Sequence, residues 1–215
     1  YYDTIIDNTH EREIDFILPQ FQLKYSISDR LNIRGALTYS FARPNFEDVI
    51  PNREVDRDAI KYGNPDLIYP LSMNADFMVE RYLNHNGILS GGIYYKNIQD
   101  FISRYTVIAT EGNVGTGTSA REITMAVNGI EAFVYGAEFQ SQFKFSFLPS
   151  IFSNFGIYSN YAFTHSDAKI NQRIPANYSD LEVNIYEDGI EILSDPEKIE
   201  HITLPGQAKH SANIA

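Results

Sequence analysis

The 215-residue sequence contains no cysteine and no tryptophan. Without cysteine, disulfide frameworks, thiolate zinc sites and cysteine nucleophiles are excluded. No apolar run approaches the roughly 18 to 20 residues that a membrane-spanning helix needs, so a helical membrane protein is excluded as well. A basic segment followed by an apolar core is also missing, so no signal peptide is recognised. The chain opens on Tyr1 and ends within a strand-like pattern, and we expect it to be a piece of a longer polypeptide.

Basic residues are scarce, and the net charge is −11. The acids are concentrated in three blocks, residues 1–15, 45–66 and 166–203, and the rest of the chain is nearly neutral. Such a surface is a poor partner for nucleic acid. Between the blocks lie segments rich in aromatic residues, which account for most of the 15 tyrosines and 14 phenylalanines.

Apolar and polar residues alternate strictly in these segments, which is the signature of β-strands with two different faces. From Leu31 to Phe41 the odd positions are mostly apolar and the even positions are polar or small. The pattern predicts strands of about ten residues or more, whereas ordinary strands average about 5–6. We predict strands at about 16–27, 31–43, 68–83, 87–107, 120–147, 154–167 and 205–215.

The connections between these strands alternate in length. Short turns at 26–30, 84–87 and 148–154 are followed by long loops at 44–67, 108–119 and 168–204. This asymmetry is typical of an outer-membrane barrel, with short periplasmic turns and long extracellular loops. The predicted fold class is therefore all-β, a transmembrane antiparallel up-and-down β-barrel, of which residues 1–215 form a segment. A soluble antiparallel sandwich would also alternate and is kept as an alternative. A small hairpin around Asp188-Gly189 is expected in the longest loop.

Six short motifs, taken in order, resemble those of TonB-dependent outer-membrane receptors. They begin with Phe41-Ala42-Arg43-Pro44-Asn45-Phe46-Glu47-Asp48 and Tyr62-Gly63-Asn64-Pro65-Asp66-Leu67. Asn74 to Tyr82, Ile93 to Ile102, Val134 to Glu138, and Leu204 to Asn213 follow. The resemblance covers nearly the whole chain, and the wording of the motifs in sequence is most similar to that of receptors from Bacteroidetes-type bacteria.

The resemblance implies a 22-stranded barrel with a plugged lumen, of which this chain would supply part of the C-terminal half. It implies localisation in the outer membrane of a Gram-negative bacterium. It also implies energy supplied by TonB through an N-terminal region that is not in this chain. Expected partners are outer-membrane lipid, the TonB complex and a nutrient ligand, with a surface lipoprotein as a further candidate.

The candidate functional residues fall into three sets. Six charged residues face the lumen by parity, because charges that face lipid at mid-depth are costly: Lys24, Arg34, Asp76, Glu80, Glu138 and Lys144. Six further residues are interpreted as architectural, since proline and glycine end strands and form turns: Arg43, Pro44, Gly63, Asn64, Pro65 and Gly136. Loop residues are candidates for substrate contact: Arg53, Arg57, Tyr62, Asn113, Tyr178 and Tyr186.

Signals for chemistry are weak. The glycine-rich segment 112–119 lacks the Gly-Lys-Ser/Thr ending and the following helix of a phosphate loop. The five histidines are scattered, and Asp56 and Asp58 do not follow calcium-loop spacing. We therefore predict no catalytic residue, no metal site and no cofactor, and expect that the chain is not an enzyme. Three functions stay open: active import of a bulky nutrient such as a siderophore or glycan, a passive pore, and a soluble or surface adhesion module.

Overall fold

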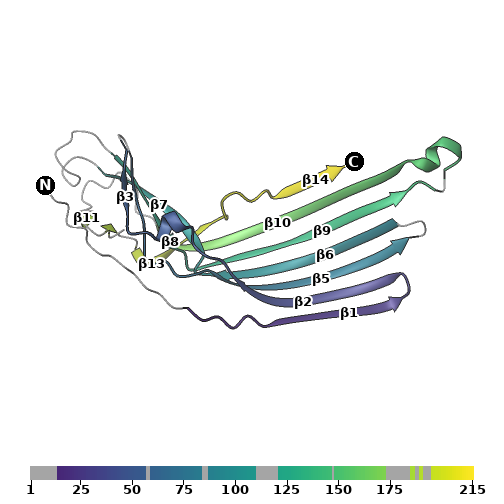
Figure 1. Ribbon diagram of the computed structural model, residues 1–215, viewed down its shortest axis with the longest axis horizontal. Helices are drawn as coiled ribbons and strands as arrows, with labels where there is room; N and C mark the ends of the chain where they lie inside the picture. Colours follow the sequence, from purple (N-terminus) through teal and green to yellow (C-terminus); the bar gives the residue numbers. More distant parts are fainter. Residues whose placement is uncertain are drawn as a thin grey trace.

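The computed structural model describes residues 14–56, 59–83, 87–109, 121–146, 148–172, 185–186, 189–190 and 195–215. Long strands lie side by side in one curved sheet, and shorter elements gather at one end of it (Figure 1). The long strands are β1 (Gln20–Ser28), β2 (Leu31–Phe41), β5 (Leu71–Leu83), β6 (Gly87–Gln99), β9 (Glu131–Lys144) and β10 (Gly156–Gln172). They are followed by β13 (Asp195–Ile202) and β14 (His210–Ile214).

The main sheet has the order β1-β2-β5-β6-β9-β10-β13, and β14 also pairs with β10. All neighbours in it are antiparallel. β13 pairs with the end of β10 around Ala168–Asn171, and β14 pairs with its middle around Ser159–Phe163. The two strands therefore lie one after the other along the same edge of β10. The predicted all-β antiparallel wall is thereby confirmed, and in the described residues the wall does not close into a barrel.

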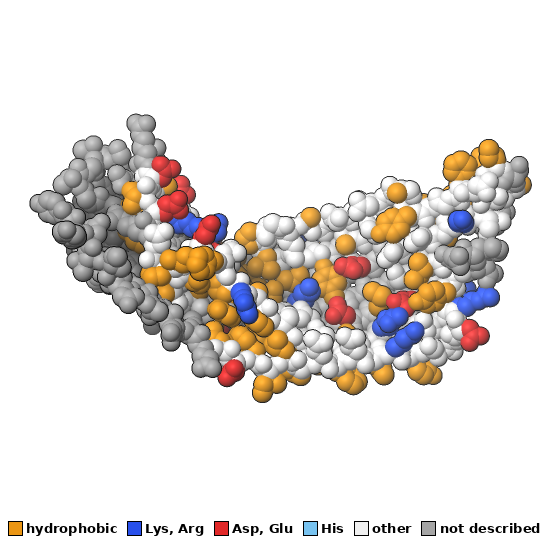
Figure 2. All heavy atoms as spheres, viewed as in Figure 1, with side chains coloured by type: hydrophobic (Ala, Val, Ile, Leu, Met, Phe, Trp, Pro, Cys, Tyr) orange, Lys and Arg blue, Asp and Glu red, His pale blue; other side chains and the backbone are white. Residues whose placement is uncertain are grey.

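The two faces of the wall differ as the alternation predicts. Register pairs such as Phe21↔Leu37, Phe77↔Ile93 and Tyr161↔Phe139 place large apolar side chains on one face. These side chains are exposed, with Phe21 65% and Ile93 62% accessible, so in the described residues no second sheet covers them. A sandwich core would bury this face, whereas a lipid-facing barrel wall leaves it uncovered. Charged side chains gather over the middle of the opposite face (Figure 2).

A smaller sheet lies beyond the long-loop end of the wall (Figure 1), in the order β3-β4-β8-β7. Its strands are β3 (Arg53–Val55), β4 (Ala59–Tyr62), β7 (Ile102–Ala109) and β8 (Arg121–Asn128). β7 and β8 continue the β6–β9 hairpin past a break at Asp100, which has a positive φ of 53°. The helix α1 (Phe46–Val49) and β3–β4 come from the loop that follows β2, and β4 pairs with β8 in parallel. We call α1, β3, β4, β7 and β8 the extracellular module.

The buried core lies in and beside this module rather than in the wall. Ile60, Leu67, Ile123 and Ile170 are the largest fully buried side chains. A second cluster joins Phe101 and Tyr105 to Ala132, Ala168 and Ile170 of the wall. A wall that has lipid on one face and the lumen on the other has no interior of its own, so its compact core forms only where a second layer meets it.

Several loop predictions differ from the structure. β10 extends to Gln172 and β13 forms at Asp195–Ile202, both inside the stretch 168–204 that was predicted to be loop. A strand that lies outside the bilayer needs no apolar face toward lipid. The apolar and polar residues of β13 therefore alternate little, and the sequence pattern did not identify it as a strand. The loop 44–67 contains a helix and two strands. The hairpin expected near Asp188-Gly189 corresponds to β11 (Ile185–Tyr186) paired with β12 (Gly189–Ile190).

Short 3₁₀ turns occur where β9 connects to β10, in η1 (Ser150–Asn154). In the described part of the chain, no helix has the length and apolar character needed to cross a membrane.

Candidate functional site

The six charged residues assigned to the lumen share the polar face of the wall. The register pairs Lys24 with Arg34, Asp76 with Tyr94, and Lys144 with Gly156, all at even positions of their strands. Arg34 and Glu80 form an ion pair across β2 and β5, with 2.9 Å between Nε and Oε1. The Glu80 side chain is only 12% exposed, so the guanidinium and the wall hold this carboxylate in place. Tyr82 also donates its hydroxyl to Glu80 Oε2, at 3.3 Å.

Glu138 lies in a hollow of the same face. The hollow has a volume of about 250 Å³, and small side chains on the neighbouring strands, among them Gly92, Ala162 and Ser211, form its walls. The register places Gly92 and Ala162 directly beside Glu138. The carboxylate is therefore presented from a recess that a side chain from another part of the protein has room to enter.

One row further along, Gly136 allows a close approach between strands. A Cβ atom at this position would lie 2.1 Å from the Phe163 carbonyl oxygen and 2.6 Å from the Tyr94 hydroxyl. Tyr94 instead reaches across Gly136 to Thr164, and the two hydroxyl oxygens are 2.5 Å apart. The aromatic ring covers the backbone that the glycine leaves bare, an arrangement known to stabilise glycine in sheets.

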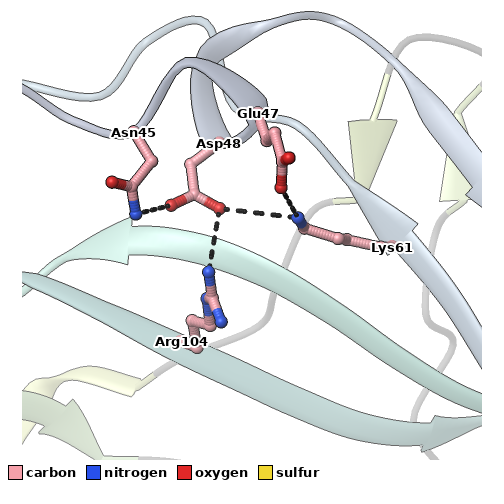
Figure 3. Close-up of polar contacts among 5 residues, drawn as sticks. All are labelled: Asn45, Glu47, Asp48, Lys61 and Arg104. Carbon is pink, nitrogen blue, oxygen red and sulfur yellow. Dashed lines mark hydrogen bonds and ion pairs between the residues drawn. The ribbon is translucent and has the colours of Figure 1, made fainter.

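In the extracellular module, Asp48 of α1 is the centre of a polar cluster (Figure 3). Its side chain is 4% exposed, and Oδ1 lies 3.5 Å from Arg104 Nη2 and 4.0 Å from Lys61 Nζ. Oδ2 accepts a hydrogen bond of 3.1 Å from Asn45 Nδ2. A buried carboxylate is stable only when it is paired and hydrogen-bonded in this way. The cluster therefore ties the loop after β2 to β4 and β7.

The Tyr62–Leu67 motif packs against the segment that contains Asp48. Asn64 N–H donates to the Asp48 carbonyl oxygen at 2.7 Å, and Gly63 N–H donates to Asn52 O at 2.9 Å. Asn64 Nδ2 reaches β8 and donates to Ala126 O at 3.0 Å. A Cβ atom at Gly63 would lie 1.7 Å from Ile50 O, so only glycine fits there. Asn64 Oδ1 also accepts from Asp66 N–H at 3.0 Å, in the turn that contains Pro65.

Arg43 and Pro44 follow the last residue of β2 and lead into α1. Arg43 is exposed and Pro44 is half-buried. Because proline cannot donate to a strand ladder, Pro44 is compatible with the end of the strand at this point.

Asn128 is a third link that the sequence did not single out. Its Nδ2 donates to Ile68 O at 2.8 Å and to Asp100 O at 2.7 Å, while its Oδ1 accepts from Ile68 N–H at 2.8 Å. Asn128, at the end of β8, thus links Asp100, at the break between β6 and β7, to Ile68, in the segment that leads into β5. An isolated asparagine has no spacing signal, so only the fold reveals this role.

The candidate substrate contacts are mostly beyond what the structure describes. Tyr62, on β4, is 3% exposed and packs inside the module. Arg53 lies on β3 and Tyr186 on β11, but their side chains are outside the described part, as are residues Arg57, Asn113 and Tyr178. Among the described residues, no group of three His, Asp or Glu side chains is placed to hold a metal ion.

The apolar face carries aromatic groups at both ends of its strands. At the long-loop end, Phe41 stacks on Phe16 with ring centroids 4.7 Å apart and lies 6.3 Å from Tyr69. At the short-turn end, Phe143 meets Phe145 at 5.7 Å and Phe152 meets Phe155 at 6.4 Å. Two such aromatic girdles flank the lipid-facing band of outer-membrane barrels.

Comparison with known proteins agrees with this architecture. The family model described as TonB dependent receptor-like, beta-barrel, matches residues 1–215. No curated protein sequence matches the chain. Among solved structures, the siderophore receptor PirA from Pseudomonas aeruginosa superposes with a TM-score of 0.55 at 15% identity, covering 71% of this chain and 29% of that chain. The ferric enterobactin receptor PfeA from Pseudomonas aeruginosa, in complex with BCV-L6, gives 0.53 at 13% identity, covering 74% and 26%.

At these identities the structural likeness shows the fold alone, and the chain spans less than a third of the length of either receptor. The family model nevertheless covers every residue and confirms the resemblance carried by the six ordered motifs. These receptors are proteins of the Gram-negative outer membrane, which confirms the predicted localisation. The chain belongs to the TonB-dependent receptor family and forms part of its outer-membrane β-barrel.

Proposed function

We propose that the protein containing this chain imports a bulky organic nutrient across the outer membrane with energy supplied through TonB, and that a siderophore is the first candidate. The observation that carries the proposal is the family match over all 215 residues. The neighbouring solved structures are described as a siderophore receptor and a ferric enterobactin receptor, which supports this choice of substrate class. Glycans and other organic complexes are the alternatives within the same transport mechanism.

The wall supports this function in two ways. Its polar face carries both acids and bases, so it suits contact with a protein plug or a passing polar ligand rather than lipid. Glu138, which lines a hollow, and the ion-paired Glu80 both present carboxylates on that face. The coupling region and the plug belong to parts of the protein outside this chain, and the TonB complex is the partner that the proposal requires.

The negative charge of the extracellular side limits which substrates are favoured. The three acidic blocks are all predicted to lie on the long-loop side of the strands, and Glu47 in the module is 82% exposed. Like charges disfavour approach, so a neutral or cationic complex is favoured over a strongly anionic one. The loop residues Arg53, Arg57, Tyr62, Asn113, Tyr178 and Tyr186 remain the proposed contacts, and the burial of Tyr62 makes it the weakest of them.

The test is growth of a strain lacking the full-length gene, in iron-limited medium with single siderophores and, separately, with single glycans as carbon source. Loss of growth on one compound, restored by the gene on a plasmid, would identify the substrate. The same compound must fail to support a strain without TonB. Uptake that continues without TonB would instead support a passive pore, the second function considered. Growth on every compound by the deletion strain would contradict import by this protein.

A further inference from the structure

Arg81 is a charged residue on the apolar face of the wall. The register pairs it with Leu31 on one side and Leu89 on the other, both at odd positions. The side chain is exposed. An arginine that faces lipid at mid-depth is costly, but the cost becomes small near the interface. Arg81 lies two residues before the end of β5, so its long side chain can reach the interface at the short-turn end.

Arg30, in the β1–β2 turn, lies beside it. Tyr82 N–H donates to the Arg30 carbonyl oxygen at 2.8 Å, and this bond fixes the turn against β5. Ser28, Arg30, Leu31, Arg81, Tyr82 and Leu83 line an open hollow of about 520 Å³. Within the described ranges neither arginine forms an ion pair, even though Asp29 lies on the same turn. Both arginines therefore line one hollow, and among the described residues no acidic side chain is paired with either of them.

The depth of this hollow is set by the aromatic residues at the same end of the sheet. The β1–β2 and β9–β10 turns lie at one end of the long strands (Figure 1). Phe152 and Phe155 in the second turn are 58% and 57% exposed, as expected for side chains at a membrane interface. In a bilayer, headgroup phosphates lie immediately beyond such aromatic residues. The hollow is thus at the level where phosphates are found, and its two leucines continue the apolar face toward the acyl chains.

We propose that Arg30 and Arg81 bind the phosphate of a phospholipid headgroup in the leaflet at the short-turn end of the barrel, the periplasmic leaflet. Guanidinium groups recognise phosphate oxygens through paired hydrogen bonds, and an interfacial site strengthens such contacts. Leu31 and Leu83 contact the first segments of the acyl chains. Leu31, Arg81 and Leu83 lie on the apolar, odd-numbered face of the wall at its short-turn end, so the site does not depend on the proposed transport function.

The experiment is native mass spectrometry of the purified full-length receptor in detergent, titrated with phosphatidylglycerol. The wild type is expected to retain the lipid, and the R30Q/R81Q variant to bind it at least about tenfold more weakly, because charged hydrogen bonds to the phosphate are lost. The matched control is K24Q, which removes one positive charge from the polar face of the same hairpin and should retain the lipid as the wild type does.

Two further measurements make the result decisive. R30K/R81K keeps both charges but loses the planar fork, so it should bind with intermediate strength and shows that a loss in R30Q/R81Q is not misfolding. Heat-modifiable migration on a gel checks that each variant is folded. Equal lipid retention by wild type and R30Q/R81Q would overturn the proposal. Inorganic phosphate that displaces the lipid completely at equal concentration would also overturn it, because the site would then recognise free phosphate.

Discussion

The ring of Tyr94 occupies the space that a side chain at Gly136 would need. Its hydroxyl passes over the glycine to Thr164, 2.5 Å from Oγ1, and an added Cβ would lie 2.6 Å from that hydroxyl and 2.1 Å from Phe163 O. Three neighbouring strands, β6, β9 and β10, meet at this point. The contact fixes their spacing on the lumen side.

Gly136→Ala should therefore destabilise the wall by about 1–3 kcal/mol, the usual cost of overpacking a close contact. The measurement is the temperature at which the full-length receptor loses its folded, heat-modifiable gel mobility. Gly35→Ala is the control, because the nearest atom to its added Cβ is 3.9 Å away. If both variants shift the transition equally, the close approach at Gly136 has no energetic importance.

Asp48→Ala should loosen the extracellular module. The substitution leaves Arg104 and Lys61 without their shared buried carboxylate, and loss of a buried charged partner costs about 1–3 kcal/mol. We expect amide hydrogen exchange at residues 59–62 and 122–125, the β4–β8 pairing, to become about tenfold faster or more. Exchange in the middle of β2 and β5 should not change.

The control for Asp48 is its neighbour Glu47. Glu47 is 82% exposed, and its ion pair with Lys61 spans 3.3 Å at the surface. Exposed pairs contribute about 0–1 kcal/mol, so Glu47→Ala should leave exchange in the module nearly unchanged. Similar acceleration in both variants would mean that the general negative charge, rather than the buried carboxylate, holds the module.

Gly63→Ala should have a larger local effect than Asp48→Ala. The added methyl group meets a backbone carbonyl, Ile50 O at 1.7 Å, and no side-chain rotation can relieve the clash. The chain must move at Gly63, which breaks the hydrogen bonds from Gly63 to Asn52 and from Asn64 to Asp48. We expect loss of protection at both amides in hydrogen exchange of the full-length receptor. Retained protection would show that the loop has an alternative conformation of similar stability.

The β9–β10 turn should lie in the membrane interface. Ile151, Phe152 and Phe155 are all more than half exposed, and residues 145–155 contain no acid. A spin label at Phe152→Cys in the reconstituted receptor should collide with oxygen more than with a water-soluble nickel complex, as a label at Phe139→Cys on the lipid-facing wall should. A label at Glu47→Cys, on the exposed surface of the extracellular module, should show the reverse. Equal access to the nickel complex at Phe152 and Glu47 would place the turn in water.

The period-two pattern allowed the two faces of the wall to be predicted because alternation is a local property of each strand. Phe77 and Ile93 lie on one face of the wall and Glu80 and Glu138 on the other, as the parity of their positions indicates. The same parity places Arg81 outward, yet a single charge among apolar neighbours gives no sign of its depth. Its depth becomes clear only from the end of β5 and the turn that packs beside it.

The extracellular module could not be predicted from the sequence. Parallel pairing of β4 with β8 joins residues about sixty positions apart, and nothing in either segment specifies the partner. The motifs around Asp48 and Asn64 indicated turns and strand ends, but not that they bond to each other and to Ala126. Such contacts arise from tertiary packing, which local patterns do not encode.

The shared sheet of the module has a consequence for exchanging loops between receptors. The loop after β2 supplies β3 and β4, while the hairpin beyond β6 supplies the strand on which β4 lies. A chimaera that receives only one of these segments would leave a row of backbone amides unpaired and a fully buried isoleucine, Ile60 or Ile123, without its neighbour. The loop after β2 and the hairpin beyond β6 should therefore be exchanged together, because the length of each must match the other.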